Sequence, residues 1–244
     1  MDARNTFQFT AFLRGLLLIL SAAVYTAILC PPALAACLLD PSGRWPSFFQ
    51  RTWVNWLLRS NGIRLRPRGL EQLDKGQPYI LVSNHASILD IPGIISASPF
   101  PLRFVAKKSL GWFPLFGWFI SLAGHILIDR NNAKSTLISL KKAGALLKKG
   151  ISIVVFPEGT RTPDGQVKNF KEGAFLLALQ SKAQIVPVSI SGTYKMLPRT
   201  GWCFRPGIME LNIGEPVSTG GLSLREAYPL RKKVRDTIIK NLKT

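Results

Sequence analysis

The segment NHASILD, residues 84–90, holds one of the two histidines of the chain, His85, and an aspartate five residues later, Asp90. Histidine titrates near neutral pH and can act as a general base, and a carboxylate can orient its ring and stabilise the imidazolium. On an α-helix, residues five apart point about 140° apart, so these side chains pair only if one lies outside the helix. An apolar run ends before the turn-like NHAS, and Pro92 is tolerated in the first turn of a helix. We therefore expect a helix to begin near Asp90, with His85 in the loop before it.

A purely structural interpretation of the same residues is open at this point. Asp90 could be a helix N-cap, or the last member of a capping box formed with Ser87. His85 could be an ordinary loop histidine, because a histidine followed by an acidic residue five positions later is common. On this motif alone the structural interpretation is favoured.

A second polar turn, PEGTRT at residues 157–162, follows the apolar run ISIVVF. Gly159 permits close approach of the backbone, and Arg161 offers a planar fork of donors that suits phosphate. Glu158 could hold that arginine, or a neighbouring amide, in place. Taken alone, this turn equally suits a surface loop with an incidental ion pair.

The two motifs together resemble those of a known family. NHASILD resembles the NHx4D motif of the glycerophospholipid acyltransferase family, and FPEGTR (156–161) is similar to its second hallmark. GHILIDR (124–130) resembles the family's glycine-to-arginine block, and IVPVSI (185–190) its proline-containing strand. The family often has serine after the arginine of FPEGTR, where this chain has Thr162.

This resemblance implies transfer of a fatty acyl group from a thioester, either acyl-CoA or acyl carrier protein, to the sn-2 hydroxyl of lysophosphatidate, giving phosphatidate. His85 would be the general base and Asp90 would orient it, with no acyl-enzyme intermediate. The supporting residues of the loop would be Asn84 and Ser87. The expected substrate-binding residues are Glu158, Gly159, Thr160, Arg161, Arg130 and Lys107.

The sequence also bears on the second histidine, on cofactors and on alternative functions. The second histidine, His125, has apolar neighbours and is interpreted as structural. The sequence has no metal-ligand cluster and no dinucleotide fingerprint, so we expect no metal and no cofactor beyond the acyl thioester co-substrate. One alternative is an acyltransferase for another lyso-lipid, such as lyso-ornithine lipid. The other is a catalytically inactive protein that binds membranes or nucleic acid.

Charge is unevenly distributed along the chain. The formal net charge is +19, yet the charges of residues 1–40 sum to zero, so residues 41–244 carry all of it. Such a basic body suits anionic membrane lipids or nucleic acid. With the resemblance above, we expect anionic lipids as partners and no nucleic acid. Three cysteines with no zinc-site spacing imply no disulfide framework.

The N-terminal region suggests a membrane anchor. Residues 15–39 form an uncharged run of 25 residues, long enough to cross a bilayer core of about 30 Å. We expect Pro31-Pro32 to end the first helix and turn the chain back. A signal peptide, with a lipoprotein-like site ending at Cys37, and a buried soluble helix are the less favoured alternatives. Residues 47–62 suit an interfacial helix or an amphipathic helix packed on the domain.

The remaining chain alternates apolar runs with helical patterns. We expect strands at 79–83, 103–106, 125–128, 151–156 and 185–190, and helices at 133–149, 172–182 and the last twenty residues. Prolines and glycines within 109–128 argue against a continuous helix and favour an apolar surface or pocket wall. This predicts an α/β fold, a mixed, largely parallel sheet flanked by helices, with an N-terminal membrane-embedded helical segment.

The expected organisation has two parts. Residues 1–62 would form the membrane anchor and interfacial helix, and residues 63–244 the acyltransferase α/β domain. The expected location is the inner, cytoplasmic membrane, with the catalytic domain on its cytoplasmic face.

Overall fold

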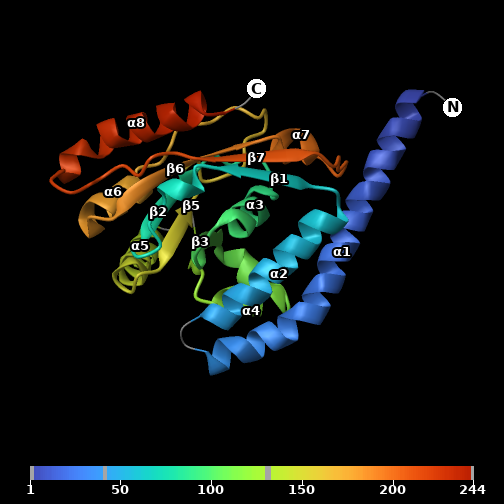
Figure 1. Cartoon of the computed structure of the whole chain (residues 1–244), viewed down its shortest axis with the longest axis horizontal. Coiled ribbons are helices and arrows are strands. Elements are labelled where there is room, and N and C mark those ends of the chain that lie inside the picture. The colour runs from blue at the N-terminus through green and yellow to red at the C-terminus, as the bar shows by residue number, and fades with distance from the viewer. Residues whose placement is uncertain (1–2, 41–42, 130–132, 243–244) are drawn as a thin grey trace.

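A sheet of seven strands organises the computed structural model, which describes residues 3–40, 43–129 and 133–242 (Figure 1). Its order is β1-β7-β6-β2-β5-β3-β4. Within the described residues, neighbouring strands pair in parallel except β6 and β7, which are antiparallel. The strands are β1 (Arg64–Arg68), β2 (Tyr79–Ser83), β3 (Leu102–Lys107), β4 (Ile126–Ile128), β5 (Ser152–Val155), β6 (Gln184–Ser191) and β7 (Ile208–Ile213).

Helices cover both faces of this sheet. The α-helices are α1 (Ala3–Leu39), α2 (Arg44–Ser60), α3 (Asp90–Ala97), α4 (Phe116–Leu122), α5 (Ala133–Lys148), α6 (Gly173–Ser181), α7 (Thr193–Met196) and α8 (Ala227–Lys240). The described residues also form the short 3-10 helices η1 (Leu70–Gln72), η2 (Lys108–Trp112) and η3 (Leu224–Glu226). Figure 1 shows α5, α6 and α8 on one side, and α3, α2 and α1 on the other. The predicted mixed, largely parallel α/β fold is confirmed.

Alternation along the central strands builds two cores. Successive side chains of a strand point to opposite faces. Ile80 and Val82 of β2 therefore join the core beneath α5, α6 and α8, whereas Leu81 joins the core beneath α2 and α3. All three are buried, as is typical of parallel strands covered on both faces. The five predicted strands correspond to β2 to β6, and the three predicted helices to α5, α6 and α8.

The expected break at Pro31-Pro32 is wrong. Helix α1 continues to Leu39 with both prolines inside it, and Figure 1 shows it bending along its length. Proline removes a backbone hydrogen bond and kinks a helix. Here both prolines face outward, while their neighbours Cys30 and Ala33 pack against α4. We infer that this packing outweighs the lost hydrogen bonds, so the chain turns back only after Leu39.

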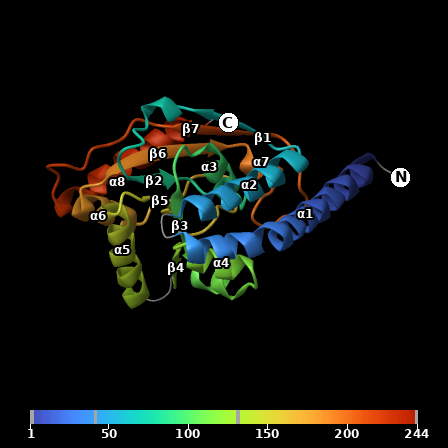
Figure 2. The same ribbon diagram turned by 60° about the horizontal axis from the view of Figure 1, so that its bottom comes forward.

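Helix α2 then runs back beside α1 and packs on α3 (Figure 2). It buries Val54, Leu57 and Leu58, while Trp45 and Phe48 are exposed. Packing on the domain is therefore observed, and contact with a membrane interface stays a prediction. The division of the chain into residues 1–62 and 63–244 also stays a prediction.

Residues 109–128 do not form one helix. They make the end of η2, the short α4 and the strand β4. Leu115 before α4 has a φ of 59°, a positive value that is uncommon for leucine. The segment forms both a pocket wall and an exposed apolar surface, as expected. Phe119 and Ile120 line a cavity, while Trp112 and Trp118 are exposed.

Candidate functional site

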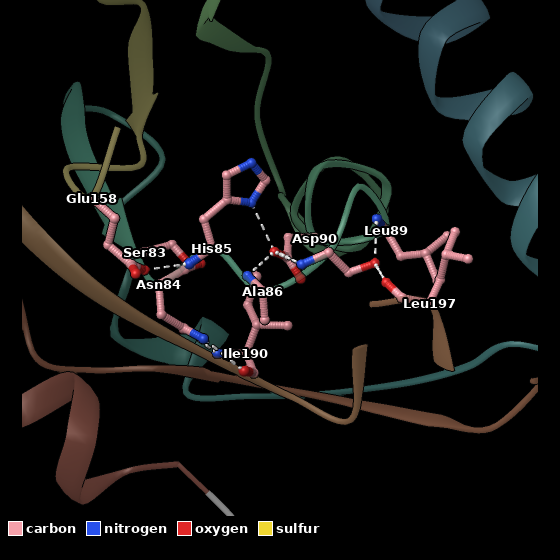
Figure 3. A network of polar contacts seen from close by, with 10 residues as sticks. Ser83, Asn84, His85, Ala86, Leu89, Asp90, Glu158, Ile190 and Leu197 are labelled. Carbon is pink, nitrogen blue, oxygen red and sulfur yellow. Dashed lines mark hydrogen bonds and ion pairs between the residues drawn. The ribbon is translucent and has the colours of Figure 1, made fainter. Parts of the chain in front are cut away.

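The His85–Asp90 pair forms where β2 ends and the chain enters α3. His85 Nδ1 lies 2.9 Å from Asp90 Oδ2 (Figure 3). The same oxygen accepts the backbone N–H groups of Ala86 and Ser87 at 2.8 and 2.9 Å. Helix α3 begins at Asp90, as predicted, and His85 lies in the loop before it. The loop therefore folds around one carboxylate oxygen, which holds the imidazole in place.

These contacts fix the tautomer of the histidine. Ionised aspartate only accepts hydrogen bonds, so His85 Nδ1 carries the proton and donates it to Asp90. The second ring nitrogen, Nε2, is left with its lone pair, and Figure 3 shows it directed away from Asp90. Asp90 is fully buried, while 12% of the His85 side chain is exposed. The ring also stacks on Phe156, with centroids 4.1 Å apart. A base at Nε2 is thus oriented and accessible.

Asn84 and Ser87 connect this loop to neighbouring segments. The Asn84 amide makes two hydrogen bonds with the backbone of Ile190 in β6, at 3.0 and 2.9 Å. The Ser87 hydroxyl donates to Leu197 O at 2.7 Å, and the Asp90 N–H goes to the backbone oxygen of Ser87, not to this hydroxyl as a capping box requires. Both side chains therefore position the loop, and Asp90 does more than cap a helix.

Glu158 joins the second motif to the first. Its carboxylate accepts the backbone N–H of His85 at 2.7 Å and that of Lys168 at 3.0 Å. Burial raises the pKa of Glu158, and these two amide hydrogen bonds oppose the rise. A further hydrogen bond runs from Thr162 N–H to His85 O at 2.8 Å. Because β2 and β5 are adjacent parallel strands, their two loops meet at the carboxyl edge of the sheet, where α/β folds bind ligands.

The PEGTRT turn presents Arg161 beside this edge. Gly159 has a φ of 77°, a conformation that favours glycine. Thr160 is exposed and Arg161 half-buried. Among the residues that the structure describes, none forms a hydrogen bond or ion pair with the Arg161 guanidinium. An unpaired guanidinium at a ligand-binding edge is suited to an anion.

The two weaker anion candidates do not join the site. Lys107 is exposed at the end of β3, and no hydrogen bond or ion pair links it to the described residues of the two loops. Arg130 lies outside the described residues. The proposed roles of both residues stay predictions.

His125 occupies a different environment. Its Nδ1 accepts the backbone N–H of Phe104 at 3.0 Å, and its Nε2 lies 3.3 Å from the Gln50 amide. Burial, assisted by nearby Arg103, lowers the pKa of His125 to about 3. A neutral histidine whose Nδ1 accepts a hydrogen bond from a strand backbone fits the structural interpretation.

An apolar cavity of about 820 Å³ lies between α1, α2, α3 and α4. It reaches the loops that follow β2 and β5 at Ile88, Leu89 and Arg161. A mostly apolar lining with few polar groups is typical of ligand pockets of roughly 300–1,000 Å³. The sequence predicted one wall of such a pocket at residues 109–128, but it did not indicate the walls that α1, α2 and α3 contribute, because these form only when the helices pack together.

A loop that the motifs did not indicate completes the rim. Residues 197–202 line the cavity, and Arg199 Nη1 donates to Arg161 O at 3.3 Å. The only signal in the sequence was an arginine within LPRTGW, a turn-like stretch after the proline-containing strand. Among the described residues, no group of three His, Cys, Asp or Glu side chains is placed to hold a metal ion.

The chain is similar to known proteins in sequence and in fold. Residues 64–191 match the family model described as Acyltransferase. The chain is 35% identical to the 1-acyl-sn-glycerol-3-phosphate acyltransferase of Limnanthes douglasii over 182 residues, 74% of this chain and 64% of that protein. It is 37% identical to the enzyme of that name from Saccharomyces cerevisiae over 185 residues, 75% of this chain and 61% of that protein. It thus spans less than two thirds of the length of these curated relatives.

A solved structure is also similar over nearly the whole chain. It is the crystal structure of the 1-acyl-sn-glycerophosphate (LPA) acyltransferase PlsC from Thermotoga maritima. The two share a TM-score of 0.78 and 30% sequence identity, covering 94% of this chain and 95% of the other. The similarity therefore includes the N-terminal helices as well as the sheet.

Proposed function

Because the chain belongs to the Acyltransferase family, we propose that it acylates the sn-2 hydroxyl of lysophosphatidate with a fatty acyl thioester, giving phosphatidate. The relatives with this activity in their names support the acceptor. The observation that carries the proposal is the His85–Asp90 pair at 2.9 Å, with Nε2 of His85 available and Arg161 on the neighbouring loop. The intact hydrogen bonds of this pair also speak against a catalytically inactive binding protein.

The reaction needs only one base. His85 Nε2 accepts the proton of the sn-2 hydroxyl while the hydroxyl oxygen attacks the thioester carbonyl carbon. Asp90 stabilises the imidazolium through the Nδ1 hydrogen bond. The tetrahedral intermediate then collapses, the carbon–sulfur bond breaks, and the thiolate takes the proton back from Nε2. Acyl-CoA and acyl carrier protein both supply this chemistry, and no enzyme nucleophile is required.

The cavity would hold the fatty acyl chain. Its apolar walls lie directly beneath Leu89, one residue before Asp90, and it extends along α1 to α4. A hydrocarbon chain buried there would gain about 0.8 kcal/mol for each methylene removed from water. The acyl carbonyl would then lie at the polar end, near the two catalytic loops.

The acceptor is tested by comparing substrates with one enzyme preparation. We expect kcat/KM for lysophosphatidate to exceed that for lyso-ornithine lipid and for lysophospholipids with larger headgroups. Each acceptor is assayed with acyl-CoA and with acyl carrier protein. Phosphatidate is identified by mass spectrometry. A higher kcat/KM for lyso-ornithine lipid would show that this lipid, and not lysophosphatidate, is the preferred acceptor.

Arg161 gives a prediction about acceptor binding. Its unpaired guanidinium would meet the phosphate of lysophosphatidate with two donors, and lysine keeps the charge without the planar fork. A charge-assisted hydrogen bond contributes roughly 1.5–3 kcal/mol, so Arg161→Ala should raise KM for lysophosphatidate about 10- to 150-fold, and Arg161→Lys by less. A rise confined to the KM of the acyl donor would assign Arg161 to the donor and leave Arg130 and Lys107 for the acceptor.

We also place the protein on the inner membrane, with its catalytic domain on the cytoplasmic face. The helical segment Gln8–Leu39 has a mean hydropathy of 2.0 and is long and apolar enough to cross a bilayer. Only 17% of its most apolar stretch is buried. Phe119 and Ile120 of α4 pack against α1, and exposed aromatic residues lie beside them. This aromatic surface comprises Trp112, Phe113 and Trp118, which are 80%, 60% and 54% exposed. Tryptophan at such a surface suits the lipid headgroup region.

The aromatic surface gives a second prediction. Replacing Trp112, Phe113 and Trp118 together by alanine should weaken binding to phosphatidylcholine vesicles at least about tenfold, because each aromatic ring contributes roughly 1.5–3 kcal/mol when buried. Vesicle co-sedimentation in high salt measures this apolar contribution, since salt screens the basic charge. The matched control is Tyr228→Ala, an equally exposed aromatic residue of α8 on the other face of the sheet. Equal binding by the triple variant and the control would exclude this surface from lipid contact.

A further inference from the structure

The loop of residues 197–204 contacts both catalytic loops and the N-terminal helix. Its Leu197 O accepts the Ser87 hydroxyl at 2.7 Å, and its Arg199 donates to Arg161 O at 3.3 Å. At its far end, Phe204 N–H donates to Ala11 O of α1 at 3.0 Å. Gly15 of α1 lies against the backbone of Trp202 so closely that a Cβ would collide with it. The loop is therefore held on several sides, and Arg199 has a defined place in the site.

Arg199 brings a second positive charge next to Arg161. Both residues line the same cavity. The ion pairs found among the described residues are His85–Asp90 and Arg231–Glu172, so neither arginine has a carboxylate partner there. The Arg199 guanidinium is held at the Arg161 backbone, so two positively charged side chains belong to the same part of the rim, where like charges repel when no anion lies between them. Their juxtaposition at the rim of a ligand cavity therefore favours an anion that carries more than one negative charge.

The position of the pair relative to His85 indicates which anion this is. Thr162, the residue after Arg161, donates its N–H to His85 O at 2.8 Å. An anion held by Arg161 and Arg199 would thus lie close to the general base. In lysophosphatidate the sn-2 hydroxyl and the phosphate are on adjacent carbons of glycerol, so the site for the phosphate must lie close to Nε2 of His85.

We propose that Arg199 is a second binding residue for the phosphomonoester of the acceptor, acting together with Arg161. This inference rests on the proposed function. Arg161 supplies a half-buried guanidinium, and Arg199 adds a second fork from the solvent side of the rim. A dianionic phosphomonoester would neutralise both charges, whereas the phosphodiester of a larger headgroup carries one negative charge. Arg199 would thereby contribute to selection of lysophosphatidate over lysophospholipids with larger headgroups.

The test compares Arg199→Ala and Arg199→Lys with the wild type. Because Arg199 is exposed and water screens its charge, Arg199→Ala should raise KM for lysophosphatidate about three- to tenfold. Its kcat and the KM of the acyl donor should change little, and Arg199→Lys should recover part of the loss. The matched control, Arg225→Ala, removes an exposed arginine from η3, outside the cavity lining, and should leave both KM values unchanged.

A neutral acceptor separates phosphate binding from a structural role. Acylation of 1-monoacylglycerol, which has the hydroxyl but no phosphate, should be equally fast in the wild type and in Arg199→Ala. The Arg161→Ala/Arg199→Ala double variant should lose less affinity for lysophosphatidate than the sum of the single variants, because both bind one phosphate.

Three outcomes would overturn the inference. They are an unchanged KM for lysophosphatidate, a rise confined to the KM of the donor, and an equal loss of rate with 1-monoacylglycerol. Failure of the proposed function looks different, because the wild-type protein itself would then form no phosphatidate from lysophosphatidate.

Discussion

Replacement of His85 by alanine is expected to reduce kcat by about 10²–10⁴-fold, the usual contribution of a positioned general base. The fold should survive, because the backbone contacts of residue 85 with Glu158 and Thr162 do not involve the imidazole. Asp90 Oδ2 would also keep its hydrogen bonds from Ala86 and Ser87. Initial rates of phosphatidate formation at saturating substrates measure the effect, with thermal unfolding as the check on folding.

The second histidine supplies the control for this experiment. His125→Ala leaves the buried Phe104 N–H without its acceptor, so it should lower the free energy of unfolding by about 1–3 kcal/mol. It should affect kcat much less than His85→Ala, because His125 is neutral and its Nδ1 is occupied. If His125→Ala were the more damaging to kcat, the assignment of the base would be wrong.

Replacement of Asp90 by asparagine is expected to reduce kcat by about 10²–10⁴-fold with little change in the fold, since comparable substitutions in serine-protease triads reach about 10⁴-fold. The asparagine carbonyl can take the place of Oδ2 and accept the same three hydrogen bonds. Its NH2 group would then occupy the site of Oδ1, a buried atom without a hydrogen-bond partner in the described residues. The neutral amide cannot stabilise the imidazolium as a carboxylate does.

Measurement of kcat, both KM values and the melting temperature separates this explanation from misfolding. A large loss of kcat with nearly unchanged melting temperature and KM values supports the electrostatic role of Asp90. The matched control is Asp236→Asn, which removes one carboxylate from α8, on the other face of the sheet. A fully active Asp90→Asn variant would show that orientation alone, without charge, is sufficient.

The central strands and the loop of the NHASILD segment could be predicted from sequence because their signals are local. Strand β2 is an unbroken apolar run, and the turn after it is followed by Pro92 in the first turn of α3. The edge strand β1 was missed because RLRPR alternates arginines and contains Pro67, a pattern that resembles a loop. Proline is tolerated at a sheet edge, and β1 is paired on one side only, with the distant β7.

The wrong and missing predictions concern features that depend on tertiary packing. Two prolines predict a break, but packing of Cys30 and Ala33 on α4 keeps α1 continuous. Arg199 lies more than one hundred residues beyond His85, and its loop joins the site through hydrogen bonds from the Arg199 and Ser87 side chains to backbone carbonyls. A backbone carbonyl can be offered by any residue type, so these long-range contacts leave no motif from which the role of Arg199 could be inferred.

The most direct test of the central claim is the stoichiometry of the reaction catalysed by the purified wild-type protein. Lysophosphatidate and an acyl thioester are mixed with enzyme, and released thiol and phosphatidate are measured over the same time course. We expect one thiol for each phosphatidate, with both formed about 10²–10⁴-fold more slowly by His85→Ala. When the acceptor is left out, we expect no burst of thiol equal in amount to the enzyme, because the acyl group passes directly from the thioester to the acceptor. A stoichiometric burst of thiol without acceptor, or thiol release without phosphatidate, would contradict direct acyl transfer by the His85–Asp90 pair.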